Sequence, residues 1–397
     1  MNVLEEQPVG ELVTEAAAKR GVASFLLFCI AHFAVDFYSS ALGVLQPLLI
    51  GQFGFSFTQA GILGGTLSFS SSVMQPLYGY LADRFHSRHF TVLAPAMAGV
   101  FISCLGWAPG YPILLAMVFL AGVGMAAFHP HASSNATTRS RNKARSMAVF
   151  ISSGTLGLAV GPAIFSFFTG RYGLRGASLV AVPGIAITAV LLILLKPERA
   201  VRHTAKPGFD WAPLRAVWKP MLLLYLLVFL RSVVQITFTQ FLPLYLHTQR
   251  GYSIRAASWS LSLYLLGGAL GGVAGGNLAD RFGGKRIILI SMIGATPLLA
   301  LFLFTTGIPS AVGLFLGGLM LLFTIPVNVV MAQRLAPTQM GTVSALMMGF
   351  GWGMAGLIFI PLTGWISDHY SMQTAFTFLL AFPLIGIVLA SKLPKTA

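Results

Sequence analysis

Charged residues, and acids above all, are scarce in this sequence. Only 9% of the 397 residues are charged and 56% are hydrophobic, whereas about 25% of a soluble domain is charged. A water-soluble fold could not cover that much apolar side chain, so we expect an integral membrane protein. At ~20 residues per spanning helix, the chain has room for about twelve spans with short loops. The apolar runs are unbroken and do not alternate, which argues against a membrane β-barrel.

Cysteine is almost absent too. Cys29 and Cys104 both lie in apolar runs, so the sequence predicts neither a disulfide framework nor a cysteine metal site. Residues 1–23 contain four glutamates but no cleavage pattern. We therefore interpret this segment as a cytoplasmic N-terminal leader and not as a signal peptide.

Basic residues give the chain a formal net charge of +15. They are interspersed between the apolar runs and not gathered on one face, so we expect no nucleic-acid partner. With the N-terminus inside, the cytoplasmic segments would hold twenty Lys and Arg residues and the outer loops four. This bias predicts that both termini are cytoplasmic and that the number of spans is even.

The fold class predicted from these runs is all-α, with twelve transmembrane helices in two pseudo-symmetric six-helix bundles. The first bundle is expected at residues 24–196 and the second at 218–393, joined by a polar cytoplasmic connector at 197–217. Binding sites in such duplicated transporters lie between the halves, near the membrane midplane. The predicted helices are 24–50, 57–82, 89–108, 112–131, 144–170, 177–196, 218–246, 256–279, 286–306, 310–333, 341–366 and 372–392.

A half-length repeat supports the duplication. The segments Gly79–Phe85 and Gly276–Phe282 differ at one position and lie 197 residues apart. Each copy ends an apolar run and opens a basic loop. A helix cap or surface ion pair without further role would not be expected to recur at the matching position of both halves. We predict a gating role for the glycine and the acidic and basic residues of both copies, namely Gly79, Asp83, Arg84, Gly276, Asp280 and Arg281.

Asp36 is the one acid that falls within a predicted span. An ionised carboxylate at that depth is costly and must face water, a partner or a proton. His32 lies four residues earlier, on the same helix face. We predict that Asp36 and His32 couple transport to protons. The alternative is a hydrogen bond that only positions the first helix.

Arg231 lies about a dozen residues into the seventh predicted helix, the repeat counterpart of the first. A buried guanidinium can bind an anionic group through two hydrogen bonds. The alternative, which the sequence leaves about equally open, is that Arg231 reaches the inner interface and pairs with lipid headgroups. The predicted substrate-binding residues are Arg231, Gln235, Tyr38, His129 and Gln75. For Gln235, Tyr38 and Gln75 taken singly, the sequence favours hydrogen bonding between helices over ligand contact.

Two other segments carry candidate residues. The fourth helix ends in Phe128-His129-Pro130-His131, where a proline kink and titratable imidazoles favour a gating or polar-packing role. A metal site is less favoured, because histidines two residues apart on a helix do not face one ligand. In the fifth helix, the small residues and proline at Gly157, Gly161 and Pro162 permit close helix contact and bending, which indicates gating.

These motifs resemble those of major facilitator superfamily transporters. The Gly-x-Leu-Ala-Asp-Arg copies match that family's loops after helices two and eight, and the Gly157–Pro162 segment partly resembles the helix-five motif of its drug:proton antiporters. The whole chain is similar to the fosmidomycin-resistance family of efflux pumps. That similarity is carried by strings around His32 and Asp36, Gln75-Pro76, Phe128-His129-Pro130, Met340-Gly341 and Ser367-Asp368-His369. The loop motif's usual glycine is His86 in the first copy and Gly283 in the second.

The resemblance implies proton-driven export of a small toxic compound by alternating access across a bacterial inner membrane, with no cofactor besides the proton gradient. One chain holds a complete two-fold unit, so a monomer is expected. An importer or exchanger of a small organic anion is the alternative within transport. A receptor or lipid-modifying enzyme is disfavoured, because the sequence has no sensor domain, catalytic triad, paired carboxylates or metal cluster.

Overall fold

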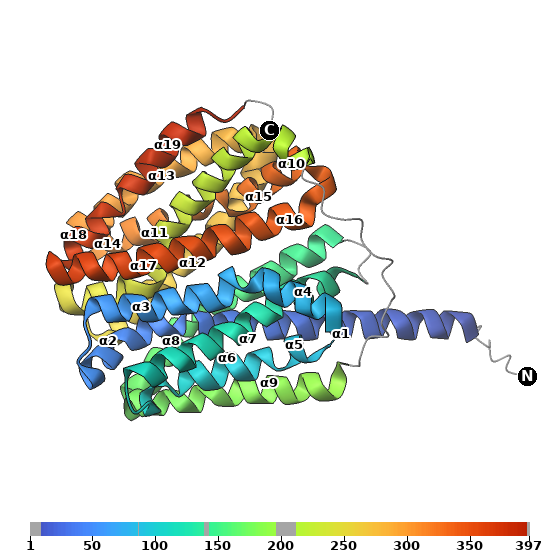
Figure 1. The fold of residues 1–397 in the computed structure, drawn as a ribbon, viewed down its shortest axis with the longest axis horizontal. Coiled ribbons are helices and arrows are strands. Elements are labelled where there is room, and N and C mark those ends of the chain that lie inside the picture. Colours follow the sequence, from blue (N-terminus) through green and yellow to red (C-terminus); the bar gives the residue numbers. More distant parts are fainter. Residues whose placement is uncertain (1–8, 86, 139–142, 196–211, 395–397) are drawn as a thin grey trace, which may run out of the picture.

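The computed structural model describes residues 9–85, 87–138, 143–195 and 212–394, and within these ranges it is helical without strands. The helices form two bundles that lie one above the other in Figure 1. The all-α, two-bundle fold predicted from the sequence is confirmed.

The first bundle contains six spans, several of them made of two or three helical segments in series. They are α1 (Val9–Ser39) with α2 (Ala41–Phe53); α3 (Phe57–Ser68), η1 (Phe69–Val73) and α4 (Gln75–Phe85); α5 (His89–Val92), α6 (Ala94–Ser103) and η2 (Leu105–Trp107); α7 (Tyr111–Thr138); α8 (Lys143–Gly176); and η3 (Ala177–Val180) with α9 (Ala181–Leu194).

The second bundle repeats this order after the short α10 (Ala212–Ala216). Its spans are α11 (Trp218–Arg250); α12 (Ile254–Phe282); α13 (Gly284–Phe304); α14 (Gly307–Leu322) with α15 (Thr324–Leu335); η4 (Pro337–Gln339), α16 (Met340–Ser344), η5 (Ala345–Phe350) and α17 (Gly351–His369); and α18 (Met372–Phe378) with α19 (Ala381–Ser391).

The described part of the chain contains nine helical segments long and apolar enough to cross a membrane. One of them, Ser146–Leu194, is 49 residues long and turns at Gly173, whose φ of 72° suits glycine. It therefore supplies two spans. The shorter apolar helical segment His89–Ser103 and the helical path Phe57–Phe85 complete the twelve spans of this fold.

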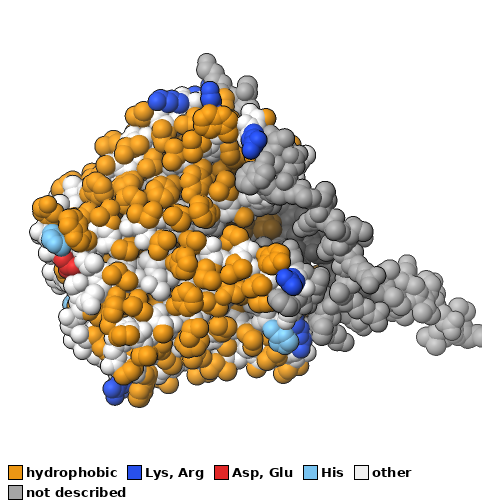
Figure 2. Space-filling model, viewed as in Figure 1, with side chains coloured by type: hydrophobic (Ala, Val, Ile, Leu, Met, Phe, Trp, Pro, Cys, Tyr) orange, Lys and Arg blue, Asp and Glu red, His pale blue; other side chains and the backbone are white. Residues whose placement is uncertain are grey.

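The first helix begins at Val9, well before the predicted residue 24, so the part of the predicted leader from Val9 onward is continuous with the first span. Most of the predicted connector (residues 197–211 of 197–217) lies outside the described residues, and α10 follows. The start of α1 and the end of α19, the first and last described helices, lie toward one end of the bundles in Figure 1. Figure 2 shows hydrophobic side chains over both bundles, with basic side chains mostly toward that same end.

Small residues let the two bundles approach at the opposite end, where α3 runs beside α17 (Figure 1). A Cβ on Gly61 would lie 2.7 Å from the carbonyl oxygen of Ile360 and 2.8 Å from Cα of Pro361. Gly364 packs against the backbone of Phe57, and Gly43 packs against that of Thr239. Real Cβ atoms do not come this close, so larger side chains would force the halves apart.

Asp368 fastens the bundles together at this closed end. Its Oδ1 accepts a hydrogen bond of 2.9 Å from the Phe57 amide, and its Oδ2 accepts bonds of 2.7 and 2.5 Å from the amide and hydroxyl of Thr58. A carboxylate of the second bundle thus satisfies the free amides at the N-terminus of α3 in the first bundle, where negative charge is favourable.

The repeat is also visible in the loops at the end that carries the chain termini. Arg88 donates to the carbonyls of Leu192 and Leu195 at the end of α9, and Lys285, 197 residues later, donates to those of Ser391 and Leu393 at the end of α19. Each basic residue thus caps the C-terminus of the last helix of its own bundle.

Candidate functional site

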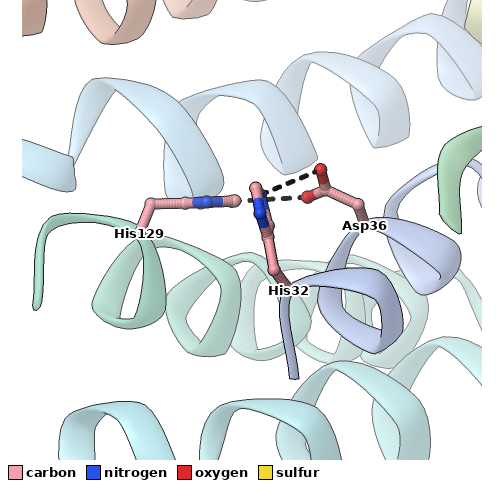
Figure 3. Close-up of side chains that lie close together, drawn as sticks. All are labelled: His32, Asp36 and His129. Atoms are coloured by element: carbon pink, nitrogen blue, oxygen red, sulfur yellow. Dashed lines mark ion pairs between the residues drawn. The ribbon is translucent and has the colours of Figure 1, made fainter. Parts of the chain in front are cut away.

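The predicted pair Asp36 and His32 lies on α1, and His129 on α7 joins it (Figure 3). His32 Nε2 is 3.3 Å from Asp36 Oδ2, and His129 Nε2 is 3.5 Å from Asp36 Oδ1. Both carboxylate oxygens therefore face an imidazole nitrogen. We call these three residues the His-Asp-His cluster.

His32 is held in one orientation. Its Nδ1 lies 2.7 Å from the carbonyl oxygen of Phe150, and its ring stacks on the Phe150 ring with centroids 4.1 Å apart. A carbonyl oxygen can only accept, so Nδ1 carries a hydrogen. The Nε2 atom of a neutral His32 would then present a lone pair to Asp36.

A proton would complete the contact between His32 and Asp36. An ionised carboxylate and a neutral Nε2 at 3.3 Å would set lone pairs against each other. A proton on either atom would relieve that contact, giving an imidazolium–carboxylate pair or a neutral histidine beside a carboxylic acid. The geometry is therefore one in which the two groups could share a proton, with His129 as a second acceptor.

The cluster is partly open. The side chains of His32, Asp36 and His129 are 9%, 15% and 28% exposed. Gly154 of α8 makes room for it, because a Cβ there would collide with the Asp36 carboxylate and the His32 ring. These are also the described residues whose donor atoms, all within 4.8 Å, could hold a metal ion. A proton satisfies the same distances without any further ligand.

The other predicted substrate residues lie elsewhere. Tyr38 is fully buried in the first bundle, where its hydroxyl donates to the Val180 carbonyl at 2.8 Å and accepts from the Gly184 amide at 2.9 Å. These hydrogen bonds join α1 to η3 and α9 within the first bundle. Gln75 donates to the Ser71 carbonyl at 2.9 Å and faces Gly349 of η5, so it lies between the bundles.

Arg231 and Gln235 form a second polar site on α11, both 4% exposed. Nη1 of Arg231 donates to Oε1 of Gln235, and its guanidinium lies 5.9 Å from the centroid of the Trp352 ring. The guanidinium is thus inside the protein. The alternative that Arg231 pairs with lipid headgroups at the interface is not what the structure shows.

The predicted gating residues fall into two groups. Gly157 and Gly161 pack against the backbone of Phe33 and Phe37 on α1, beside Pro162, so their contacts lie within the first bundle. A gating role for them stays a prediction.

In the first copy of the loop motif, the surroundings of Gly79 and Asp83 lie outside what the structure describes. Arg84 is exposed and donates a hydrogen bond to the Tyr80 hydroxyl. In the second copy, Gly276 faces Pro326, and Asp280 and Arg281 are exposed. Within the described chain, Asp280 forms no ion pair. The gating role of Asp280 stays a prediction. Gly283 follows with a φ of 85°, which explains glycine at this position.

The joining of His129 to Asp36 could not be derived from the sequence, because it depends on the packing of α1 against α7. The supporting residues Phe150 and Gly154 were also missed. Gly154 belongs to the small-residue segment of the fifth helix. Such a segment predicts close contact with another helix but does not identify the residues in that contact.

Comparison with known proteins gives consistent results. The family model described as Major Facilitator Superfamily matches residues 28–347 and 251–396. The fosmidomycin resistance protein of Escherichia coli is 26% identical over 97% of each chain. An uncharacterised transporter of this type from Bacillus subtilis is 29% identical, covering 93% of this chain and 92% of its own.

A probable sulfoacetate transporter of Cupriavidus necator is 24% identical, covering 91% of this chain and 90% of its own. The solved structure of a bacterial homologue of the human lysosomal transporter Spinster, inward-facing and occupied, superposes with a TM-score of 0.76. It shares 14% identity and covers 94% of this chain and 97% of its own.

Proposed function

This chain is a transporter of the Major Facilitator Superfamily, and we propose that it exports small toxic compounds in exchange for protons by alternating access. It is a multi-pass membrane protein. The bacterial inner membrane, cytoplasmic termini and a monomeric state are parts of the proposal. The protons and the transported solute are the proposed partners, and the proton gradient replaces a cofactor.

The His-Asp-His cluster carries this proposal. Among the acids whose side chains the structure describes, Asp280 and Asp368 are exposed at helix ends and Asp36 is not exposed, and the distances in the cluster suit a shared proton. Proton entry from outside would neutralise Asp36 and change the charge presented to a bound solute. Release of that proton to the cytoplasm would restore the charge and rebind solute, which couples the two fluxes.

The closed end of the protein supports alternating access. The α3–α17 contact and the Asp368 hydrogen bonds seal the end opposite the chain termini. By the positive-inside count, that end faces outward. The proposed state is therefore inward-facing, and the cycle requires these contacts to break while the loop-motif residues close the other end.

Export of a toxic compound is supported by the similarity to the fosmidomycin resistance protein over nearly the whole chain. Identity of 26% leaves room for a different solute, because a shared fold does not fix what is carried. The solute is therefore proposed only as a small compound of this kind.

The test uses proteoliposomes with an imposed pH gradient and fosmidomycin as the probe solute. Asp36→Asn should abolish proton-driven flux, because the amide cannot carry the proton, yet preserve solute–solute exchange in the absence of a gradient. Retained exchange controls for folding and binding. If Asp36→Asn supports full proton-driven flux, the coupling assignment is wrong. Wild-type flux that requires added metal and stops with EDTA would assign the cluster to a metal.

A second candidate is uptake or exchange of a small organic anion on the same fold. The buried Arg231 and the similarity to a probable sulfoacetate transporter favour it. The direction of flux under an imposed proton gradient separates the two candidates. Inward accumulation with protons, or one-for-one anion exchange insensitive to pH, would favour the second.

A further inference from the structure

The guanidinium of Arg231 is buried without a matching negative charge. Arg231 is 4% exposed, and its Nε–H has no hydrogen-bond partner in the described structure. Among the described residues, the guanidinium donates a hydrogen bond to the neutral side chain of Gln235. A buried cation that lacks a counter-charge is strongly unfavourable unless something supplies one.

No described acid can supply that charge. Asp36 faces the two histidines of the cluster, Asp280 is exposed near the chain-terminal end of the bundles, and Asp368 binds the N-terminus of α3 at the other end. Within the described residues, none of the three forms an ion pair with Arg231.

Two aromatic residues pack on the face of α11 that carries Arg231. Phe238, two helical turns after Arg231, stacks on Tyr264 of α12 with ring centroids 5.2 Å apart, and Tyr264 is fully buried with a hydroxyl that has no hydrogen-bond partner in the described structure. Trp352 of α17 presents its ring 5.9 Å from the guanidinium carbon. The site therefore offers two buried donors, the Arg231 Nε–H and the Tyr264 hydroxyl, beside an aromatic surface.

An oxyanion group matches these donors. Carboxylate, sulfonate and phosphonate groups have several acceptor oxygens and a negative charge, and arginine binds them through paired hydrogen bonds. A neutral polar group would satisfy the donors but leave the charge uncompensated.

We propose that Arg231 and Tyr264, beside Trp352, form the subsite that binds the carboxylate, sulfonate or phosphonate group of the transported solute. This inference rests on the proposed transport function and names the charge class of its solute. The repeat offset that aligns Arg88 with Lys285 places Arg231 opposite Ala34, within one turn of Asp36. The anion subsite and the proton site would then lie at similar depth in opposite halves.

The experiment measures equilibrium binding to the purified full chain in nanodiscs, with no proton gradient. The probes share one ring and differ in the attached group: benzoate, benzenesulfonate, phenylphosphonate and neutral benzamide. We expect at least one anionic probe to raise the Tm of the wild-type protein in a concentration-dependent manner, with benzamide giving no shift. In Arg231→Gln, the apparent Kd for that anion should rise at least tenfold.

Arg250→Gln is the matched control, since it makes the same substitution in the same helix. The Arg250 guanidinium is already bound by the carbonyls of Phe302, Leu303 and Thr305 and by two hydroxyl groups. This variant should lower the Tm but leave the anion Kd within about twofold. If Arg231→Gln does not fold, Tyr264→Phe tests the same site and should raise the anion Kd several-fold.

The proposal is overturned if no anionic probe binds the wild-type protein, if benzamide binds as well as the anions, or if both site variants bind anions normally. Failure of the transport proposal looks different. Anion binding in this assay without proton-coupled flux in proteoliposomes would preserve the subsite and reject the coupling. Proton-driven flux restricted to neutral solutes would preserve the coupling and reject the anion subsite.

Discussion

Asp368→Ala should release the closed end of the transporter. The substitution removes three hydrogen bonds that join α17 to the N-terminus of α3. Hydrogen bonds to a charged acceptor contribute about 1.5–3 kcal/mol each, whereas loss of an N-cap side chain costs about 0.5–2 kcal/mol. Because Asp368 is exposed and screened by water, we expect about 1–2 kcal/mol. That corresponds to a roughly 5- to 30-fold shift toward opening at this end.

The assay is labelling of a single cysteine by a membrane-impermeant maleimide. Gln240 of α11 is suitable, because it is 3% exposed and lies against Gly43 and Gly64 at the closed end. In a background with both native cysteines replaced by alanine, Gln240→Cys should react slowly. Adding Asp368→Ala should speed labelling by roughly the 5- to 30-fold shift worked out above.

Two further variants make the result specific. Thr58→Val removes one of the three bonds and should give a smaller increase, whereas Arg255→Ala changes an exposed charge at the same end and should give none. An unchanged labelling rate in folded Asp368→Ala protein would refute the view that this carboxylate holds the halves together.

Three further outcomes follow from the packing. Gly154→Ala should fold with a lowered Tm and lose proton-driven flux in proteoliposomes, because its Cβ would displace Asp36 and His32; full flux would contradict the cluster geometry. Gly283→Ala should lower the free energy of unfolding by about 1 kcal/mol in a denaturant titration, since its φ is 85°. Arg250→Met should lower the Tm by several degrees in a thermal melt, because it leaves the carbonyls of Phe302 and Thr305 without their donor.

The helix count and the two bundles could be predicted because they follow from hydrophobic runs and a repeat, which are local properties of the chain. The helix interruptions could not. The π-helical turns η1 and η5 face each other between the bundles, where Gly349 of η5 lies against the Ser72 carbonyl of η1. Such turns arise from tertiary packing and are frequent at functional sites, but no periodicity in the sequence marks them.

The sequence could single out groups that are costly to bury, but it could not supply their partners. Asp36 and Arg231 stand out because an ionisable group within an apolar run is a functional candidate by default, and their roles stay predictions. Tyr38 is predicted to bind substrate from its polarity alone, whereas its hydroxyl forms hydrogen bonds with the Val180 carbonyl and the Gly184 amide. The sequence shows which groups are costly to bury but not which neighbour relieves the cost.

Some positions keep the repeat and have the same structural role in both halves. Other positions differ between the halves, and these include the candidate site residues. Arg88 and Lys285 do the same work in each half, binding the end of that bundle's last helix. With the same offset, Asp36 falls opposite Val233 and Arg231 opposite Ala34. Among the described residues, the first half thus has an acid and the second half a base at a position within a span that the repeat does not match. A duplicated scaffold needs symmetry to rock between two states, but coupling a proton to a solute needs two different sites. Asp36 and Arg231 are charged residues at which this chain departs from its own repeat.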